Sequence, residues 1–203
     1  MPASRVLISL AIAGVVVAGF SACANDTVAT PTETNSSAAT PAPTQSAEPT
    51  ATPTAEPVGT PVTIGCETLI TAQELYDWDP NFVPQTTYKP VEGSDAATIV
   101  DDQGIACAWV QQTSGQIVEV AVASLPEEEL TTLKNAFVLE VPSVPTYGDP
   151  LKVEGYFQPG ETFGHADVFS GPYWISADSD AFFEPGDALP IIEAALAGLG
   201  QPE

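Results

Sequence analysis

Apolar and polar residues alternate most regularly over residues 116–124, where three valines occupy every second position. This period of two predicts a β-strand with one buried face. Residues 106–111 predict another strand, with Cys107 and Trp109 on one face, and Thr113-Ser114-Gly115 predicts a hairpin turn between the two segments. The valines are Val118, Val120 and Val122.

Shorter segments rich in β-branched and aromatic residues predict further strands. They cover residues 97–100, 151–157, 164–169 and 173–177. Gly171-Pro172 predicts a turn between the last two strands. Because successive side chains of a strand point to opposite faces, Tyr173 and Trp174 are expected on opposite sides of the sheet.

Capping boxes predict the starts of two helices. Thr71-Ala-Gln-Glu74 begins a short helix that ends near Trp78, before Pro80. Ser124-Leu-Pro-Glu127 begins a second helix, in which residues at i, i+3 and i+7 form the buried face. The residues of that face are Leu130, Leu133 and Phe137.

The chain is expected to end in an apolar helix over residues 187–199, with Pro190 in its first turn and Gly200 as its C-terminal stop. Hairpins followed by helices then occur twice, over residues 106–137 and 165–199, which suggests two similar halves. The whole order of elements predicts an α+β domain over residues 63–203, an antiparallel sheet with helices packed on one face.

The first 22 residues have the features of a signal peptide. Arg5 precedes an apolar run of 15 residues, 6–20, which is short for a membrane-spanning helix. Phe20-Ser21-Ala22-Cys23 resembles the lipobox of bacterial lipoproteins, and this resemblance implies that residues 1–22 are removed and that Cys23 is lipidated. The alternatives are a plain secretory signal, in which Cys23 is incidental, and an uncleaved apolar helix.

Residues 23–62 contain mainly proline, threonine, alanine and serine and show no apolar periodicity. Such a segment cannot bury a core, so we expect a disordered linker with extended polyproline II stretches. The linker would hold the domain away from the membrane, and its composition is also that of O-glycosylated stalks.

Acidic residues outnumber basic ones, 27 to 4, which gives a formal net charge of −23. Nucleic acid binding and attachment to anionic lipid headgroups both need basic patches, so this composition argues against both. A large charge of one sign favours a soluble monomer. The basic residues are Arg5, Lys89, Lys134 and Lys152.

The cysteines indicate an oxidising compartment. If Cys23 carries lipid, Cys66 and Cys107 are the only remaining pair, and a disulfide between them is expected outside the cytoplasm. No CxxC spacing supports a redox or metal pair, and the only histidine, His165, is distant in sequence.

Two cysteine-containing segments carry a family resemblance: CETLITAQEL at residues 66–75 and GIACAWV at residues 104–110. Together with the lipobox and the linker, they resemble a group of actinobacterial cell-envelope lipoproteins with an α+β domain of unknown function. Similar sequences often have a basic residue between the second cysteine and the tryptophan, where this chain has Ala108.

No motif predicts a catalytic, metal or cofactor site. Asp77-Trp-Asp79-Pro-Asn81 resembles the opening of a calcium loop, but Phe82 stands where such a loop needs glycine, so a helix-ending turn is favoured. His165 would share a strand face with Asp167, but without an adjacent nucleophile we expect a surface histidine. Cell-wall hydrolysis by paired carboxylates is the alternative function.

An aromatic-rich segment over residues 147–183 is the candidate ligand-binding region, and Tyr156, Phe157 and Trp174 are its candidate contacts. The simpler interpretation is that these side chains form the core. We therefore expect a non-catalytic lipoprotein on the extracytoplasmic face of the cell membrane, which binds an envelope protein or a small apolar ligand.

Overall fold

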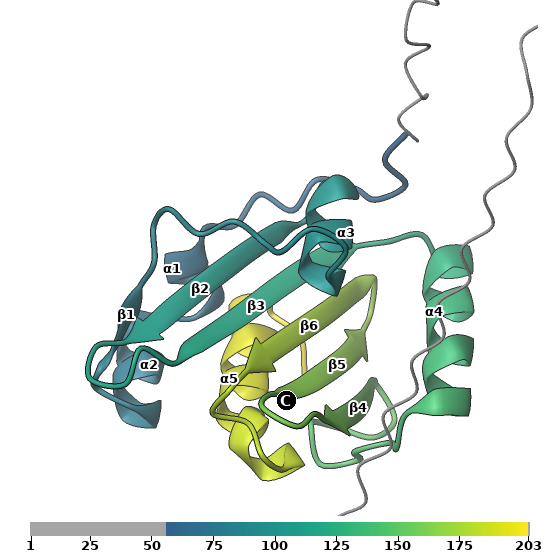
Figure 1. Cartoon of the computed structure of the whole chain (residues 1–203). Coiled ribbons are helices and arrows are strands. Elements are labelled where there is room, and N and C mark those ends of the chain that lie inside the picture. The colour runs from purple at the N-terminus through teal and green to yellow at the C-terminus, as the bar shows by residue number, and fades with distance from the viewer. Residues whose placement is uncertain (1–55, 203) are drawn as a thin grey trace, which may run out of the picture. The chain divides into compact units, whose positions relative to one another are not determined.

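Six antiparallel strands form one sheet in the order β1-β2-β3-β6-β5-β4 (Figure 1). The computed structural model describes residues 56–202, so the predicted signal peptide, Cys23 and most of the predicted linker lie outside the described residues. The strands are β1 (Phe82–Pro84), β2 (Ile105–Gln111), β3 (Ile117–Ser124), β4 (Val153–Pro159), β5 (Gly164–Ser170) and β6 (Tyr173–Ser179).

Five helices accompany the sheet within residues 56–202. They are α1 (Cys66–Leu69), α2 (Ala72–Trp78), α3 (Asp95–Asp101), α4 (Glu127–Glu140) and α5 (Pro185–Gly198). The predicted α+β class with an antiparallel sheet is therefore confirmed. None of these helices is long and apolar enough to cross a bilayer.

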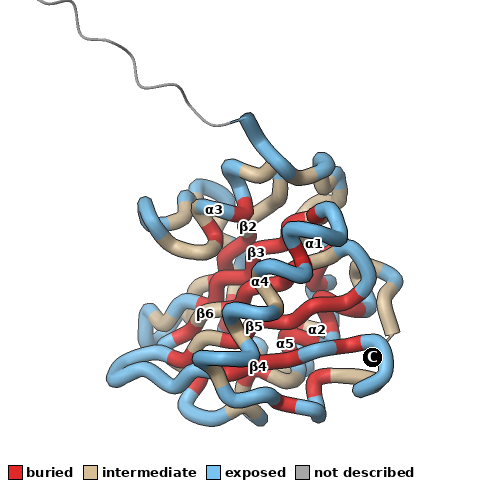
Figure 2. Tube along the Cα trace, turned by 90° about the vertical axis from the view of Figure 1, so that its right-hand side faces the viewer, coloured by how far each residue is buried: buried red, intermediate tan, exposed pale blue. Residues whose placement is uncertain are grey.

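The helices lie on both faces of the sheet, although the sequence suggested only one. Helices α1, α2 and α5 pack on one face, over a core that includes Val118, Val120 and Val122 (Figure 1). Helices α3 and α4 pack on the other face, over a smaller core around Ala121 and Phe169. Because β3 is buried on both sides, its alternate residues include small apolar side chains as well as valines (Figure 2).

Each half of the sheet is a three-stranded meander, β1-β2-β3 and β4-β5-β6, and the halves meet where β3 pairs with β6. A two-fold axis perpendicular to the sheet would relate the two meanders and leave their faces unchanged. The helices that follow them, α4 and α5, instead lie on opposite faces. The similarity of the halves is therefore limited to the strands.

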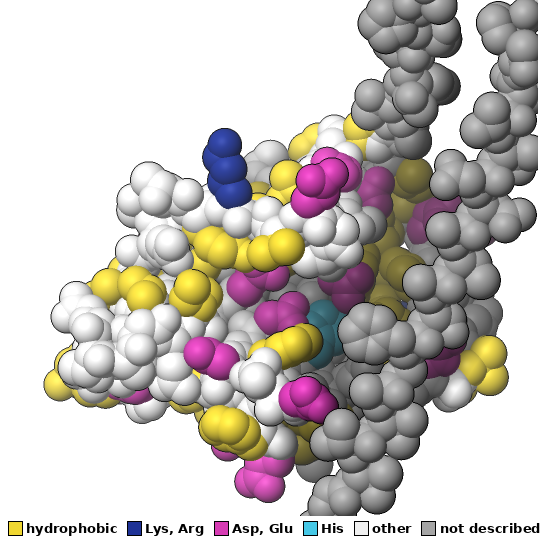
Figure 3. All heavy atoms as spheres, in the orientation of Figure 1, with side chains coloured by type: hydrophobic (Ala, Val, Ile, Leu, Met, Phe, Trp, Pro, Cys, Tyr) yellow, Lys and Arg dark blue, Asp and Glu magenta, His cyan; other side chains and the backbone are white. Residues whose placement is uncertain are grey.

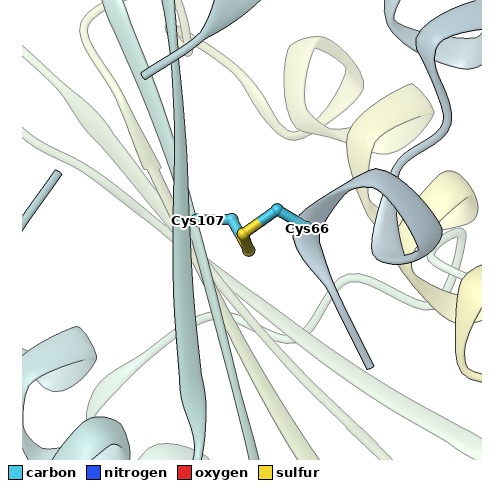
Figure 4. Close-up of a disulfide and its surroundings, with 2 residues drawn as sticks. All are labelled: Cys66 and Cys107. Atoms are coloured by element: carbon cyan, nitrogen blue, oxygen red, sulfur yellow. A yellow bond between two sulfur atoms is a disulfide. The ribbon is translucent and has the colours of Figure 1, made fainter. Parts of the chain in front are cut away.

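The disulfide between Cys66 and Cys107 is present, as predicted, and links α1 to β2 (Figure 4). The two cysteines are separated by 41 positions, and Cys107 is 1% exposed. The bond therefore attaches the first helix directly to the core of the sheet.

Three sequence-based predictions of elements were wrong. Residues 97–100 belong to helix α3, because Ser94 caps the helix and Ala96 and Ile99 face the core. Ser124 does not cap α4, because it continues β3 and pairs with Tyr173.

The last helix, α5, begins earlier than predicted. Its start is at Pro185, where Asp187 accepts hydrogen bonds from the backbone N–H groups of Phe183 and Glu184. Pro190 consequently lies in the second turn of the helix, rather than in its first.

Two segments outside the helices and strands complete the domain. Thr60 pairs with Ser124, and the Val62 N–H donates to the Gln103 carbonyl at 3.0 Å, so contacts with the domain begin upstream of residue 63. Residues 142–144 run along the outer edge of β4 and exchange backbone hydrogen bonds with it.

Candidate functional site

One face of the sheet carries a row of polar side chains in the centre of the domain. Pairing places His165 on β5 opposite Asp178 on β6, and Asp178 opposite Glu119 on β3. Asp167 lies two residues after His165 and therefore on the same face. Figure 3 shows acidic side chains gathered around the histidine in a hollow of this face.

Helix α3 adds a further carboxylate to this row. Ser94 accepts a hydrogen bond from the Ala97 N–H at 3.1 Å and so fixes the start of the helix. Asp95, the first residue of α3, then projects toward His165. We call Asp95, Glu119, His165, Asp167 and Asp178 the histidine cluster.

Both ring nitrogens of His165 contact carboxylates. Nδ1 lies 2.8 Å from Asp178 Oδ1. Nε2 lies 2.5 Å from Asp167 Oδ2 and 3.2 Å from Asp95 Oδ2. The side chain of His165 is only 14% exposed, so the predicted surface histidine is wrong. The predicted shared face with Asp167 is correct.

The electrostatics of the cluster follow from burial and from these contacts. Burial opposes a charged imidazole, but hydrogen bonds to the three aspartates outweigh it and raise the pKa of His165 to about 12. Burial raises the pKa of Asp167 above its ordinary value, against the opposing effect of His165. Burial and the nearby Asp178 carboxylate raise the pKa of Glu119 to about 7.

Neighbouring polar groups complete the cluster. Trp174 Nε1 donates a hydrogen bond to Asp167 Oδ1 at 2.8 Å. Ser176 lies opposite Asp167 and is 1% exposed, and its Oγ has no hydrogen-bond partner. A cavity of about 320 Å³ reaches Asp95, His165 and Asp178 from the surface, so part of the cluster is accessible to small solutes.

A second, apolar cavity of about 450 Å³ lies beside the disulfide. Strand β1 ends at Pro84, so within the described residues positions 105–107 of β2 have no strand partner on this side. Both cysteines line the cavity, together with aromatic and aliphatic side chains from α1, α2, β2 and the segment between α2 and α3. Those side chains include Ile70, Leu75, Tyr76, Phe82, Tyr88 and Trp109.

The lining of this apolar cavity also contains the polar side chains of Glu67, Gln85 and Thr86. The Gln85 Oε1 is buried without a hydrogen-bond partner, and the Gln85 backbone N–H donates to the Ala108 carbonyl at 2.8 Å. Glu67 is the acidic residue of the lining.

The three aromatic candidates from the sequence are not brought together. Tyr156, Phe157 and Trp174 are 4%, 3% and 2% exposed. Tyr156 and Trp174 belong to the core under α4, whereas Phe157 belongs to the core on the opposite face. They therefore cannot line one pocket.

The segment resembling a calcium loop is a helix-ending turn, as favoured from the sequence. Asp79 accepts hydrogen bonds from the backbone and side-chain nitrogens of Asn81, at 2.8 and 2.9 Å, and the backbone bond lowers its pKa. Asp77 accepts from Gln73 at 2.8 Å. Both carboxylates therefore accept hydrogen bonds from residues close to them in the sequence, which accounts for them without a calcium ion.

No protein-family model, curated protein or solved structure matches this chain. The features of the described domain that bear on its function are the histidine cluster and the apolar cavity.

Proposed function

We propose that this protein is a membrane-tethered lipoprotein of the extracytoplasmic face, whose domain binds a small, largely apolar ligand without catalysing a reaction. The observation that supports the binding role is the cavity of about 450 Å³ beside the disulfide. Ligand sites typically have volumes of about 300–1,000 Å³ and apolar walls with a few oriented polar groups.

The lining of the cavity restricts the ligand's chemistry. Gln85 lines the cavity and its buried Oε1 has no hydrogen-bond partner, so a ligand with one N–H or O–H donor would gain a hydrogen bond when this side chain turns toward the cavity. Glu67 disfavours an anionic ligand. The ligand class is therefore an uncharged molecule with an apolar body and a single hydrogen-bond donor.

Hydrolysis by paired carboxylates receives less support. Asp95, Asp167 and Asp178 all contact His165, so they are engaged in ion pairs. Glu119, whose raised pKa would suit a general acid, is only 8% exposed and does not line the cavity that reaches His165. Binding is accordingly the function that the geometry favours.

Filling the cavity should abolish ligand binding. The probe is N-phenyl-1-naphthylamine, an uncharged aromatic amine with one N–H group that fluoresces in apolar surroundings. Ala72 lines the cavity and is exposed, so Ala72→Trp should fit without disturbing the core and weaken probe binding at least about tenfold, or 1.4 kcal/mol.

The matched control is Ala136→Trp, at an exposed position of α4 away from the cavity. It should bind the probe like the parent protein, and Gln85→Leu should bind it more weakly. Equal affinity of the parent and Ala72→Trp would refute binding in this cavity.

The proposed tether depends on Cys23. Cys23→Ser should move the protein from the membrane to the soluble fraction, because two acyl chains anchor a protein stably and the serine variant would carry none. Intact mass of the parent should show a diacylglyceryl group on an N-terminal Cys23. An unmodified Cys23 in the membrane-associated parent would contradict the tether and leave the cavity test unaffected.

A further inference from the structure

The histidine cluster contains three potential ligand atoms for a metal ion. His165 Nε2, Asp95 Oδ2 and Asp167 Oδ2 come from a strand and a facing helix, and the three residues can place their ligand atoms within 4.8 Å of one another. Neighbouring ligand atoms around a divalent ion with bonds of about 2.1 Å are separated by about 3.0–3.4 Å. The two carboxylate oxygens lie 2.5 and 3.2 Å from Nε2, so only a small opening is needed to admit an ion.

The potential metal ligands His165 and Asp167 each form a hydrogen bond with a further side chain, as the ligands of metal sites commonly do. When an ion displaces the proton on Nε2 of His165, the proton that remains on Nδ1 is donated to Asp178 Oδ1, 2.8 Å away, which fixes the tautomer that presents Nε2 to the ion. Trp174 Nε1 donates to Oδ1 of Asp167 and leaves Oδ2 for the same ion. Both hydrogen bonds orient metal ligands, and the one from Nδ1 to a carboxylate also raises the basicity of the imidazole.

The charge of the cluster also favours a cation. Three carboxyl groups, those of Asp95, Asp167 and Asp178, surround the single imidazole of His165. None of the three lysines within residues 56–202 forms an ion pair with them: Lys134 pairs with Glu154, Lys152 pairs with Asp149, and Lys89 contacts none of the three aspartates. A divalent ion on a neutral imidazole would supply two positive charges in place of one.

A further polar atom and an open path complete the arrangement. Ser176 Oγ is buried without a partner opposite Asp167, so it can accept a hydrogen bond from an ion-bound water. The cavity of about 320 Å³ that reaches Asp95 and His165 provides entry for an ion. The side chain of Asp95, 44% exposed, is the outermost ligand.

We propose that Asp95, His165 and Asp167 bind one divalent transition-metal ion, with Asp178 and Trp174 as orienting partners. A mixed set of one imidazole nitrogen and two carboxylate oxygens suits Zn²⁺, whereas Ca²⁺ and Mg²⁺ prefer oxygen ligands alone. The cavity that reaches the metal site shares no lining residue with the apolar cavity. The metal site therefore stands or fails independently of the proposed ligand binding.

The decisive measurement uses the unaltered, untagged protein, because His165 is its only histidine. After treatment with EDTA, the imidazole ¹⁵N spectrum near pH 7 should show one histidine, and one equivalent of Zn²⁺ should shift Nε2 to the position of a metal-bound nitrogen. An imidazolium spectrum that persists in the presence of zinc would overturn the proposal, because His165 would then be only a counter-ion of the three aspartates.

Equilibrium dialysis with metal analysis gives the stoichiometry and the contribution of Asp95. The parent should bind one Zn²⁺ per chain in preference to Ca²⁺, and Asp95→Asn should bind it at least about tenfold more weakly. Asp101→Asn, at the exposed end of the same helix, is the matched control and should bind like the parent. Equal zinc binding by the two variants, or a preference for Ca²⁺, would overturn the assignment.

Discussion

Replacing Cys66 and Cys107 together with alanine is expected to lower the free energy of unfolding by about 4 kcal/mol. The disulfide closes a loop whose ends are 41 positions apart, and removing it restores the conformational entropy of that loop to the unfolded chain. For a domain of this size the loss corresponds to a decrease in Tm of about 10 °C. Urea and thermal unfolding of the purified protein measure both values.

A reductant provides the control for the disulfide prediction. Dithiothreitol should lower the Tm of the parent protein toward that of the double variant, and it should leave the double variant itself unchanged. A double variant that unfolds within about 1 kcal/mol of the parent would show that the bond adds little to the packing of α1 against β2.

Glu119→Gln is expected to stabilise the domain increasingly as the pH rises. The pKa of Glu119 is raised to about 7 by burial and by Asp178, from an ordinary value of 4.5. Between these two pH values the unfolded chain releases the proton while the folded protein keeps it, so folding becomes less favourable as the pH increases. Glutamine is uncharged and escapes this loss.

The advantage of the variant over the parent should increase by about 2 kcal/mol between about pH 5 and about pH 8, as measured by urea unfolding with EDTA present. A constant offset from the new amide cancels in this comparison. Glu140→Gln, at an exposed position of α4, controls for the removal of one acidic charge. A pH-independent difference between Glu119→Gln and the parent would contradict the raised pKa.

Strands β2 to β6 were predictable because each carries a local signal, whereas β1, three residues long, was missed. Alternating valines identified β3, and the expectation that Cys23 is lipidated left Cys66 and Cys107 as a single pair, which the structure joins. Residues 97–100 were wrongly predicted as a strand because Thr98, Ile99 and Val100 have β-branched side chains, which favour strands intrinsically. Tertiary contacts of Ala96 and Ile99, together with the Ser94 cap, override that preference.

Part of the histidine cluster was within reach of the sequence. If Gly171-Pro172 is a two-residue hairpin loop, Ser170 pairs with Tyr173, and counting back along both strands places His165 opposite Asp178. Asp95 and Glu119 could not be found in this way. Their positions depend on the packing of α3 and on the pairing of β3 with β6, contacts that no short-range pattern encodes.

The apolar cavity could not be predicted from the sequence either, because it forms where strand β1 ends before its partner β2 does. Strand β1 stops at Pro84, and the chain that follows diverges from β2 instead of continuing the ladder. The aromatic candidates Tyr156, Phe157 and Trp174 were selected by composition, which does not distinguish a core from a pocket.

The two edge strands of the sheet, β1 and β4, affect whether neighbouring copies of the domain can associate through their strands. At one edge, β1 is only three residues long and ends in proline. At the other edge, the backbone of residues 142–144 already forms hydrogen bonds with the outer side of β4. Strand-to-strand polymerisation between copies requires a long unoccupied edge. Many copies of this domain could therefore be concentrated on one surface without assembling into fibrils.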